Sequence, residues 1–174
     1  MAAVSALLLS PLVIPYLVFG ISLLLFFHSL GIGLSFATLT IAHIVLSIPY
    51  TILVLVPRLG QIDISLEEAA RDLGATRLQT FRSIILPLIL PAVVSAFLIA
   101  LTVSFDEYAV ASFVKGPTVT FPVYLYAALR FPNQLPQVIA VAVVVISVSL
   151  FVVVAAEVGR RVAERRLGDI EAPG

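Results

Sequence analysis

Long apolar runs separated by shorter polar stretches dominate the pattern along the chain. Four of these runs reach the length of about 20 residues that an α-helix needs to cross a bilayer. They cover residues 6–27, 35–56, 88–105 and 138–156. The last run is rich in valine, but inside a bilayer a lone apolar segment satisfies its backbone hydrogen bonds only as a helix. The pattern therefore predicts an all-α membrane protein with four transmembrane helices.

Three connections separate the four runs. Residues 28–34 form a short turn, residues 57–86 form the main polar loop, and residues 106–137 form a mixed connection with four prolines. The mixed connection is partly apolar, so we expect it to pack at the outer interface or to dip into the helix bundle. Three prolines inside the first two runs are expected to kink their helices. They are Pro11, Pro15 and Pro49.

Composition supports the membrane interpretation. Hydrophobic residues make up 61% of the chain and charged residues 11%, whereas a soluble domain carries roughly 25% charged residues. The net charge of zero gives no electrostatic reason to expect nucleic-acid binding. The chain has no cysteine, and His28 and His43 are too few for a metal cluster. We find no nucleophile–base pair and no phosphate-binding glycine loop, so neither an enzyme nor a cofactor site is predicted.

The first apolar run has an alternative interpretation as a signal peptide. Signal peptides begin with a positively charged region and end at a cleavage site with small residues. No Lys or Arg precedes Arg58, and the apolar run continues to Phe27. A membrane-spanning helix is therefore the favoured interpretation.

Basic residues predict the orientation of the helices, because cytoplasmic loops are enriched in Lys and Arg. The polar loop 57–86 and the tail 157–174 each hold four arginines, and the other connections hold only Lys115 and Arg130. The arginines are Arg58, Arg71, Arg77 and Arg82 in the loop and Arg160, Arg161, Arg165 and Arg166 in the tail. We expect loop and tail in the cytoplasm, and with four spans the N-terminus lies there too.

The polar loop carries two possible helix starts. Ser65 precedes Glu68 by three residues, and Thr76 precedes Gln79 by three residues. Both pairs match the capping box, in which the two side chains satisfy free N–H groups at the start of a helix. Gly74 lies between them, where the end of a helix favours a residue that tolerates positive φ. The loop is predicted to be a helix over 66–73, a glycine turn, and a second helix over 77–86 that meets Pro87 at the third span.

The first loop helix has two different faces. An apolar stripe contains Leu66, Ala69, Ala70 and Leu73. Glu67 and Arg71 form an i, i+4 pair on the other side. A helix of two turns is not stable alone, so it must dock on its own bundle or on a cytoplasmic partner. The residues themselves leave both possibilities open.

The spacing of the loop residues resembles the signature of permease subunits of binding-protein-dependent ABC importers. The residues that carry the resemblance are Glu68, Ala69, Ala70, Gly74, Ile84, Leu86 and Pro87. The resemblance implies a type I importer permease fold in a bacterial inner membrane. It also implies that the loop is a cytoplasmic coupling helix seated in a groove of a separate ATP-hydrolysing subunit. By the same resemblance, the residues that contact the ATPase are Glu68, Ala69, Ala70 and Gly74.

Further partners follow from the same resemblance: an ATPase dimer, a second permease subunit, a periplasmic substrate-binding protein and the lipid bilayer. Permeases of this family usually have six spanning helices. Residues 1–174 would therefore form one permease domain that resembles the last four helices, either as a natural truncation or as a fragment.

Two other stretches, residues 20–26 and 104–117, look like the corresponding regions of spermidine/putrescine permeases. The resemblance implies a polyamine as solute. Within the second stretch, Asp106, Glu107 and Tyr108 are candidates for binding a cation, because a polyamine suits paired carboxylates beside an aromatic face. The acidic pair is also compatible with ordinary interfacial residues at a helix end. Tyr124 and Tyr126 are further candidate aromatic faces, and all three tyrosines fit equally well as residues of the membrane interface.

Two alternatives remain at this point. One is an importer for another small solute, such as an organic cation, iron or a phosphonate. The other is a secondary transporter or membrane scaffold outside the ABC class. Secondary transporters place polar groups in the middle of their spans, whereas these spans are nearly free of charge and the polar residues gather in the loop. This distribution favours the ABC importer.

Overall fold

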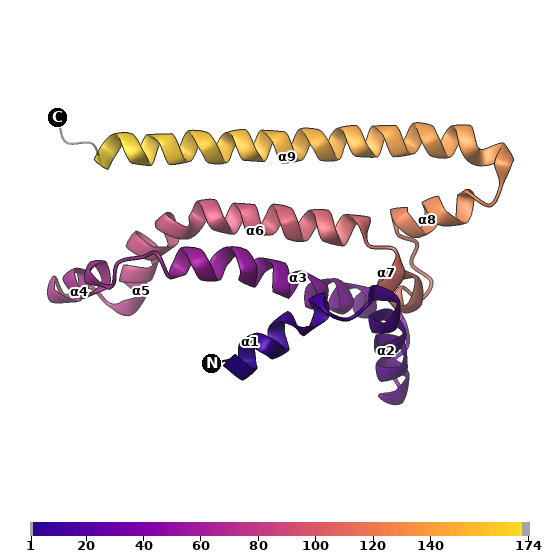
Figure 1. Cartoon of the computed structure of the whole chain (residues 1–174), viewed down its shortest axis with the longest axis horizontal. Coiled ribbons are helices and arrows are strands. Elements are labelled where there is room, and N and C mark those ends of the chain that lie inside the picture. The colour runs from indigo at the N-terminus through magenta and orange to yellow at the C-terminus, as the bar shows by residue number, and fades with distance from the viewer. Residues whose placement is uncertain (1, 172–174) are drawn as a thin grey trace. The chain divides into compact units, whose positions relative to one another are not determined.

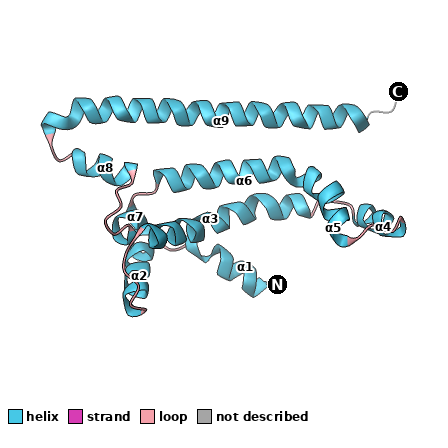
Figure 2. Ribbon diagram, turned by 180° about the vertical axis from the view of Figure 1, so that it is seen from behind, coloured by secondary structure: helices cyan, strands magenta, loops and turns pink. Residues whose placement is uncertain are grey.

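The computed structural model describes the backbone of residues 2–171, and the side chains of these residues except 2, 3, 5, 160 and 162–171. Residues 172–174, the end of the expected tail, lie outside the described part. Every regular element within residues 2–171 is helical (Figure 2), which confirms the all-α prediction. The chain forms two compact units, Met1–Tyr50 with Ala100–Leu150 and Thr51–Ile99 with Phe151–Gly174. We call them the first and the second unit.

The first predicted span is broken rather than continuous. Helix α1 (Ala2–Leu9) leads into a 3-10 turn at Ser10–Leu12, and α2 (Tyr16–Ser29) follows Pro15 (Figure 1). The two helical pieces are bent by 115° at this break. The reason is the proline at the N-cap of α2, with ψ at 133°, because a proline also disfavours the α conformation of the residue before it. The expectation of one kinked helix over 6–27 therefore needs this correction.

Among the residues that the structure describes, three helical segments are long and apolar enough to cross a membrane: Phe36–Leu59, Arg77–Asp106 and Pro132–Gly159. The number becomes four if the bent pair at the N-terminus counts as one span. Helix α3 (Phe36–Leu59) is not interrupted at Pro49. Helix α9 (Leu135–Glu171) continues well past residue 156, so the tail begins as an extension of the last helix.

The core of the first unit forms where α2 packs against α7 (Ala109–Val114) and α3. A Cβ added to Gly20 of α2 would lie 2.8 Å from the Phe113 ring and 3.0 Å from the Val110 Cα, so only glycine allows this close approach. The fully buried Thr38 of α3 donates a 2.7 Å hydrogen bond to the Val114 carbonyl. The mixed connection 106–137 therefore dips into the core through α7. The buried core residues are Phe19, Phe27, Leu39, Ala42, Leu46, Val110, Ala111 and Val114.

The polar loop and the helix after it, as far as Ile99, belong to the second unit. Helix α4 (Ile64–Asp72) is followed by α5 (Arg77–Thr80), a π-helical turn at Phe81–Ile85, and α6 (Leu86–Asp106) (Figure 1). The predicted second loop helix runs into the third span without a break, because α5, the π turn and α6 form one continuous helix. The wider turn lies where Pro87 lacks an N–H and its ring crowds the carbonyl four residues earlier.

Candidate functional site: the α4 loop and the acidic pair after α6

The start of α4 is capped by Asp63. Its Oδ1 accepts a 2.9 Å hydrogen bond from the Ser65 N–H. This N–H, with a smaller contribution from the Ser65 hydroxyl, holds the pKa of the Asp63 carboxyl below its usual range. Ser65 lies inside the helix, so the predicted Ser65–Glu68 capping box is wrong. Asparagine, aspartate, serine and threonine are all good N-caps, and here the earlier acid takes the position that sequence spacing assigned to the later serine.

The end of α4 follows the prediction. Gly74 has φ of +82°, and its N–H donates to the Arg71 carbonyl at 2.8 Å. The next N–H, of Ala75, donates to the Ala70 carbonyl at 3.0 Å. Thr76 then starts α5 with the expected capping box, in which Gln79 Oε1 accepts from the Thr76 N–H at 2.8 Å. The Gly74 turn is thus held by its own backbone between two capped helices.

The apolar stripe of α4 is mostly uncovered. Leu66 is 41% exposed and Leu73 is 90% exposed, and Ala69 between them is also exposed. Only Ala70 is buried, at 8%. Of the four predicted contact residues, Glu68, Ala69 and Gly74 are therefore accessible, whereas Ala70 is part of the packing of the loop itself. We call Leu66, Ala69 and Leu73 the exposed stripe of α4.

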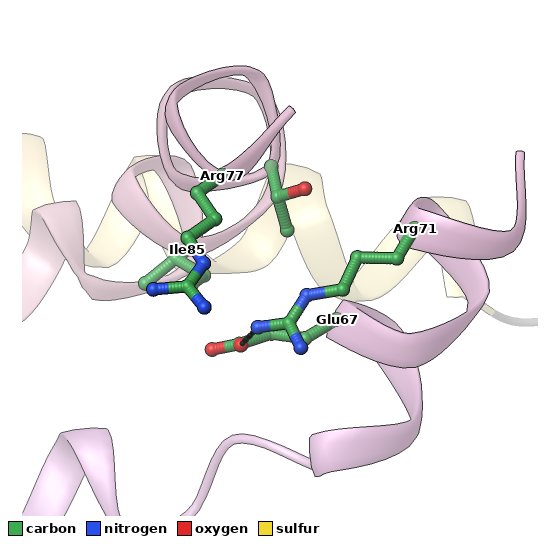
Figure 3. Close-up of a pocket in the computed structure, with 5 residues that line it drawn as sticks. Glu67, Arg71, Arg77 and Ile85 are labelled. Carbon is green, nitrogen blue, oxygen red and sulfur yellow. Dashed lines mark hydrogen bonds and ion pairs between the residues drawn. The ribbon is translucent and has the colours of Figure 1, made fainter. Parts of the chain in front are cut away.

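A pocket of about 270 Å³ lies between α4 and the segment formed by α5 and the π turn. It is lined by Glu67, Arg71, Arg77, Thr80 and Ile85 (Figure 3). The predicted Glu67–Arg71 pair is present, with 3.1 Å between Glu67 Oε2 and Arg71 Nη2. No sequence pattern pointed to Arg77 and Ile85 as neighbours of this pair, because a glycine turn separates them from α4.

The acidic pair of the first unit is divided by the structure. Glu107 is 5% exposed, and its two carboxylate oxygens accept 2.7 Å hydrogen bonds from the N–H groups of Val110 and Ala111. Asp106 is exposed at the end of α6. Tyr108 stacks on Tyr126 of α8 (Phe121–Ala128) with 4.0 Å between ring centroids. The two carboxylates therefore lie in different environments: Glu107 caps α7, and Asp106 faces outward.

Sequence reasoning missed a group of polar side chains near Glu107. His43 Nδ1 lies 2.7 Å from Ser104 Oγ, and the hydroxyls of Tyr16 and Tyr50 lie 2.7 Å apart. The Glu107 charge acts on both Tyr16 and His43. His43 Nε2 is buried and has no hydrogen-bond partner among the described residues. The sequence signal was weak, since each residue is a single polar position in an apolar run.

Comparisons with known proteins match nearly the whole chain to one family. Residues 2–165 match the family described as the binding-protein-dependent transport system inner membrane component. The putrescine transport system permease protein PotI of Escherichia coli (strain K12) is 38% identical over 170 residues, covering 93% of this chain and 60% of the relative.

Two further relatives carry a related name. The spermidine/putrescine transport system permease protein PotC of Escherichia coli (strain K12) is 35% identical over 97% of this chain and 64% of its own length. PotC of Haemophilus influenzae is 39% identical over 87% of this chain and 59% of its own length. The chain thus spans less than two thirds of the length of these curated relatives.

Proposed function

Because the chain belongs to the inner membrane component family of binding-protein-dependent transport systems, we propose that it is a permease subunit of an ABC importer for polyamines. In this proposal the loop 57–86 couples the permease to a separate ATPase subunit. The observation that carries the proposal is the exposed stripe of α4, an apolar surface on a short helix with a cap at its start and a glycine turn at its end.

The coupling role rests on how the loop is built. Asp63 and the Gly74 turn hold both ends of α4, and the side chains of its stripe are exposed. Leu73, with 90% of its surface exposed, is an apolar side chain that a docked protein would cover. We propose that Glu68, Ala69 and Gly74 contact the ATPase, and that Ala70 contributes by keeping the loop packed behind them.

Displacement of the loop reaches the membrane through a single helix. The segment from Arg77 to Asp106 is continuous, so a movement of α5 is transmitted to α6 without an intervening flexible link. The π turn at Phe81–Ile85 lies at the junction, and π turns are frequent at functional positions of helices. ATP-driven movement of the partner would in this way be converted into movement of a spanning helix.

The topology that this role requires has the loop and the tail in the cytoplasm. The four arginines of the loop support it through the positive-inside rule. A second permease subunit and a periplasmic substrate-binding protein complete the proposed importer. Single cysteines introduced at Gln79 and Asn133 should react with membrane-impermeant reagents from opposite sides. Labelling of both positions from the outer side would contradict this topology.

For the solute, the named functions of the relatives and the residues after α6 support a polyamine. Asp106 is exposed two residues before Tyr108, whose ring stacks on Tyr126, and a carboxylate together with aromatic rings suits an ammonium group. Glu107 contributes its negative charge from a buried position, while its oxygens hold the start of α7. Asp106 and Tyr108 are therefore the proposed cation contacts, and Glu107 acts at a distance.

The test is uptake of labelled spermidine and putrescine into proteoliposomes that hold this chain with its ATPase, partner permease and binding protein. We expect uptake that requires ATP and stops with a catalytically inactive ATPase. Uptake that continues without the ATPase would overturn the importer class. Uptake of an organic phosphonate in place of both amines would overturn the polyamine assignment.

A further inference from the structure

The pocket behind α4 has the composition of a site for an anionic group. Arg71 and Arg77 approach it from the two sides of the Gly74 turn, and Figure 3 shows their guanidinium groups on either side of Glu67. Glu67 forms an ion pair with Arg71. No ion pair or hydrogen bond joins the Arg77 side chain to another of the residues that the structure describes. Two guanidinium groups against one carboxylate leave one unbalanced positive charge in the pocket.

The position of the pocket beside a candidate span favours one kind of anion. Helix α6 has 21 residues, which is about 31 Å at 1.5 Å per residue and matches the hydrocarbon thickness of roughly 30 Å. With α6 taken as the part of the candidate span that crosses the hydrocarbon, Ile85 and Thr80, which precede it by one and six residues, lie about 2–9 Å beyond the hydrocarbon. This is the layer of the lipid headgroups, which adds roughly 5–8 Å on each side.

The direction of one side chain in the second unit agrees with this placement. The Arg77 side chain extends from the start of α5 toward Ile85 (Figure 3), so its charge lies closer to α6 than its backbone.

We propose that this pocket binds the headgroup phosphate of an anionic phospholipid such as phosphatidylglycerol. The phosphate diester carries one negative charge, which balances the unpaired guanidinium, and Arg71 and Arg77 can both donate to its oxygens. Ile85 supplies an apolar floor on the membrane side for the glycerol and the upper acyl chain. A volume of about 270 Å³ suits a headgroup rather than a whole solute, because pockets for drug-sized ligands run from roughly 300 to 1,000 Å³.

The proposal goes beyond the transport function and does not depend on the solute. A lipid phosphate held between α4 and the α5–α6 helix would join the docking surface to the spanning helix. It is favoured over an acidic side chain of a docked protein because the pocket residues lie at headgroup depth. The exposed stripe of α4 is formed by other residues.

The experiment uses the full chain, purified in detergent, stripped of lipid and titrated with dioctanoyl phosphatidylglycerol, dioctanoyl phosphatidylcholine or inorganic phosphate. Bound lipid is counted by native mass spectrometry. Phosphatidylglycerol should bind most tightly, and Arg77→Gln should weaken it by about fivefold, the effect of one basic residue near an anionic lipid surface. Arg130→Gln, which removes the same charge from an exposed position outside the pocket, should leave binding unchanged.

A gain of affinity separates specific binding from damage to the fold. Glu67→Gln removes the only carboxylate that lines the pocket, so it should bind phosphatidylglycerol more tightly than the native chain. Equal binding by the native chain and Arg77→Gln would overturn the proposal. Inorganic phosphate that competes for the pocket as well as phosphatidylglycerol would also overturn the proposal. An Arg77→Gln variant that loses ATPase binding but keeps phosphatidylglycerol would overturn it in favour of an acidic group on the partner.

Discussion

Replacing Glu107 by glutamine tests whether this carboxylate caps α7 or binds the solute directly. Both of its oxygens accept backbone N–H groups at 2.7 Å in a site that is 5% exposed. Glutamine keeps one acceptor oxygen and places an amide NH₂ opposite the other N–H. One charge-assisted hydrogen bond is lost, and one buried N–H remains unsatisfied.

The cost can be estimated from these contacts. A hydrogen bond to a charged group contributes about 1.5–3 kcal/mol to folding stability. For a chain of this length each kcal/mol shifts the unfolding midpoint by about 2–4 °C, so Glu107→Gln should lower it by about 3–12 °C. The matched variant Asp106→Asn changes an exposed residue and should stay within about 0.5 kcal/mol of the native chain.

The chain has neither tryptophan nor cysteine, so thermal unfolding in detergent is best followed by far-ultraviolet circular dichroism. Spermidine uptake in the assembled transporter supplies the second measurement, and Asp106→Asn should lower uptake without changing the unfolding midpoint. A Glu107→Gln variant with native thermal stability and no uptake would refute the capping role. It would place the Glu107 carboxylate in direct contact with the solute.

Three more outcomes are expected. Gly116→Ala should destabilise the first unit by roughly 1–3 kcal/mol in thermal unfolding. The reason is that Gly116 has φ of +58° and an added Cβ would collide with a neighbouring backbone carbonyl. Gly33→Ala is the control, because the space around Gly33 is open. Ala69→Arg, at an exposed position, should abolish co-purification of the ATPase while the thermal unfolding midpoint stays native. Ala70→Arg should also disturb the loop, because Ala70 is buried. Normal co-purification of the ATPase with Ala69→Arg would contradict docking. The pKa of the Asp63 cap is lowered, so its stabilisation of α4 is complete above the ordinary carboxyl pKa of about 3.9 and is lost as the pH falls through the lowered pKa. Protection of the α4 amides from hydrogen exchange should follow this trend. Asp63→Asn should remove the pH dependence.

Local patterns predicted the parts of this structure that are set by nearby residues. The three long spans follow from apolar length alone. The Gly74 turn and the Thr76 cap follow from residues that satisfy the ends of adjacent helices. The Asp63 cap was missed because two residues in the same turn could serve as N-cap, and spacing alone does not choose between them.

The missed features depend on prolines or on tertiary contacts. Pro15 breaks the first span, and Pro87 lies just after a π turn that no sequence pattern indicated. Glu107 looked equivalent to Asp106 in the sequence, but the N-terminus of α7 takes up its carboxylate. The His43–Ser104 contact joins residues 61 positions apart, and no local pattern indicates such a pair.

Photo-crosslinking from the exposed stripe of α4 tests the coupling role most directly. Leu73 is 90% exposed, and Val119, at 63% exposed, is a control outside the loop. A benzoyl-phenylalanine introduced at Leu73 in the assembled transporter should crosslink to the ATPase subunit, and one at Val119 should not. Products at Leu73 that contain only this chain or lipid would contradict the proposal that α4 docks on the ATPase.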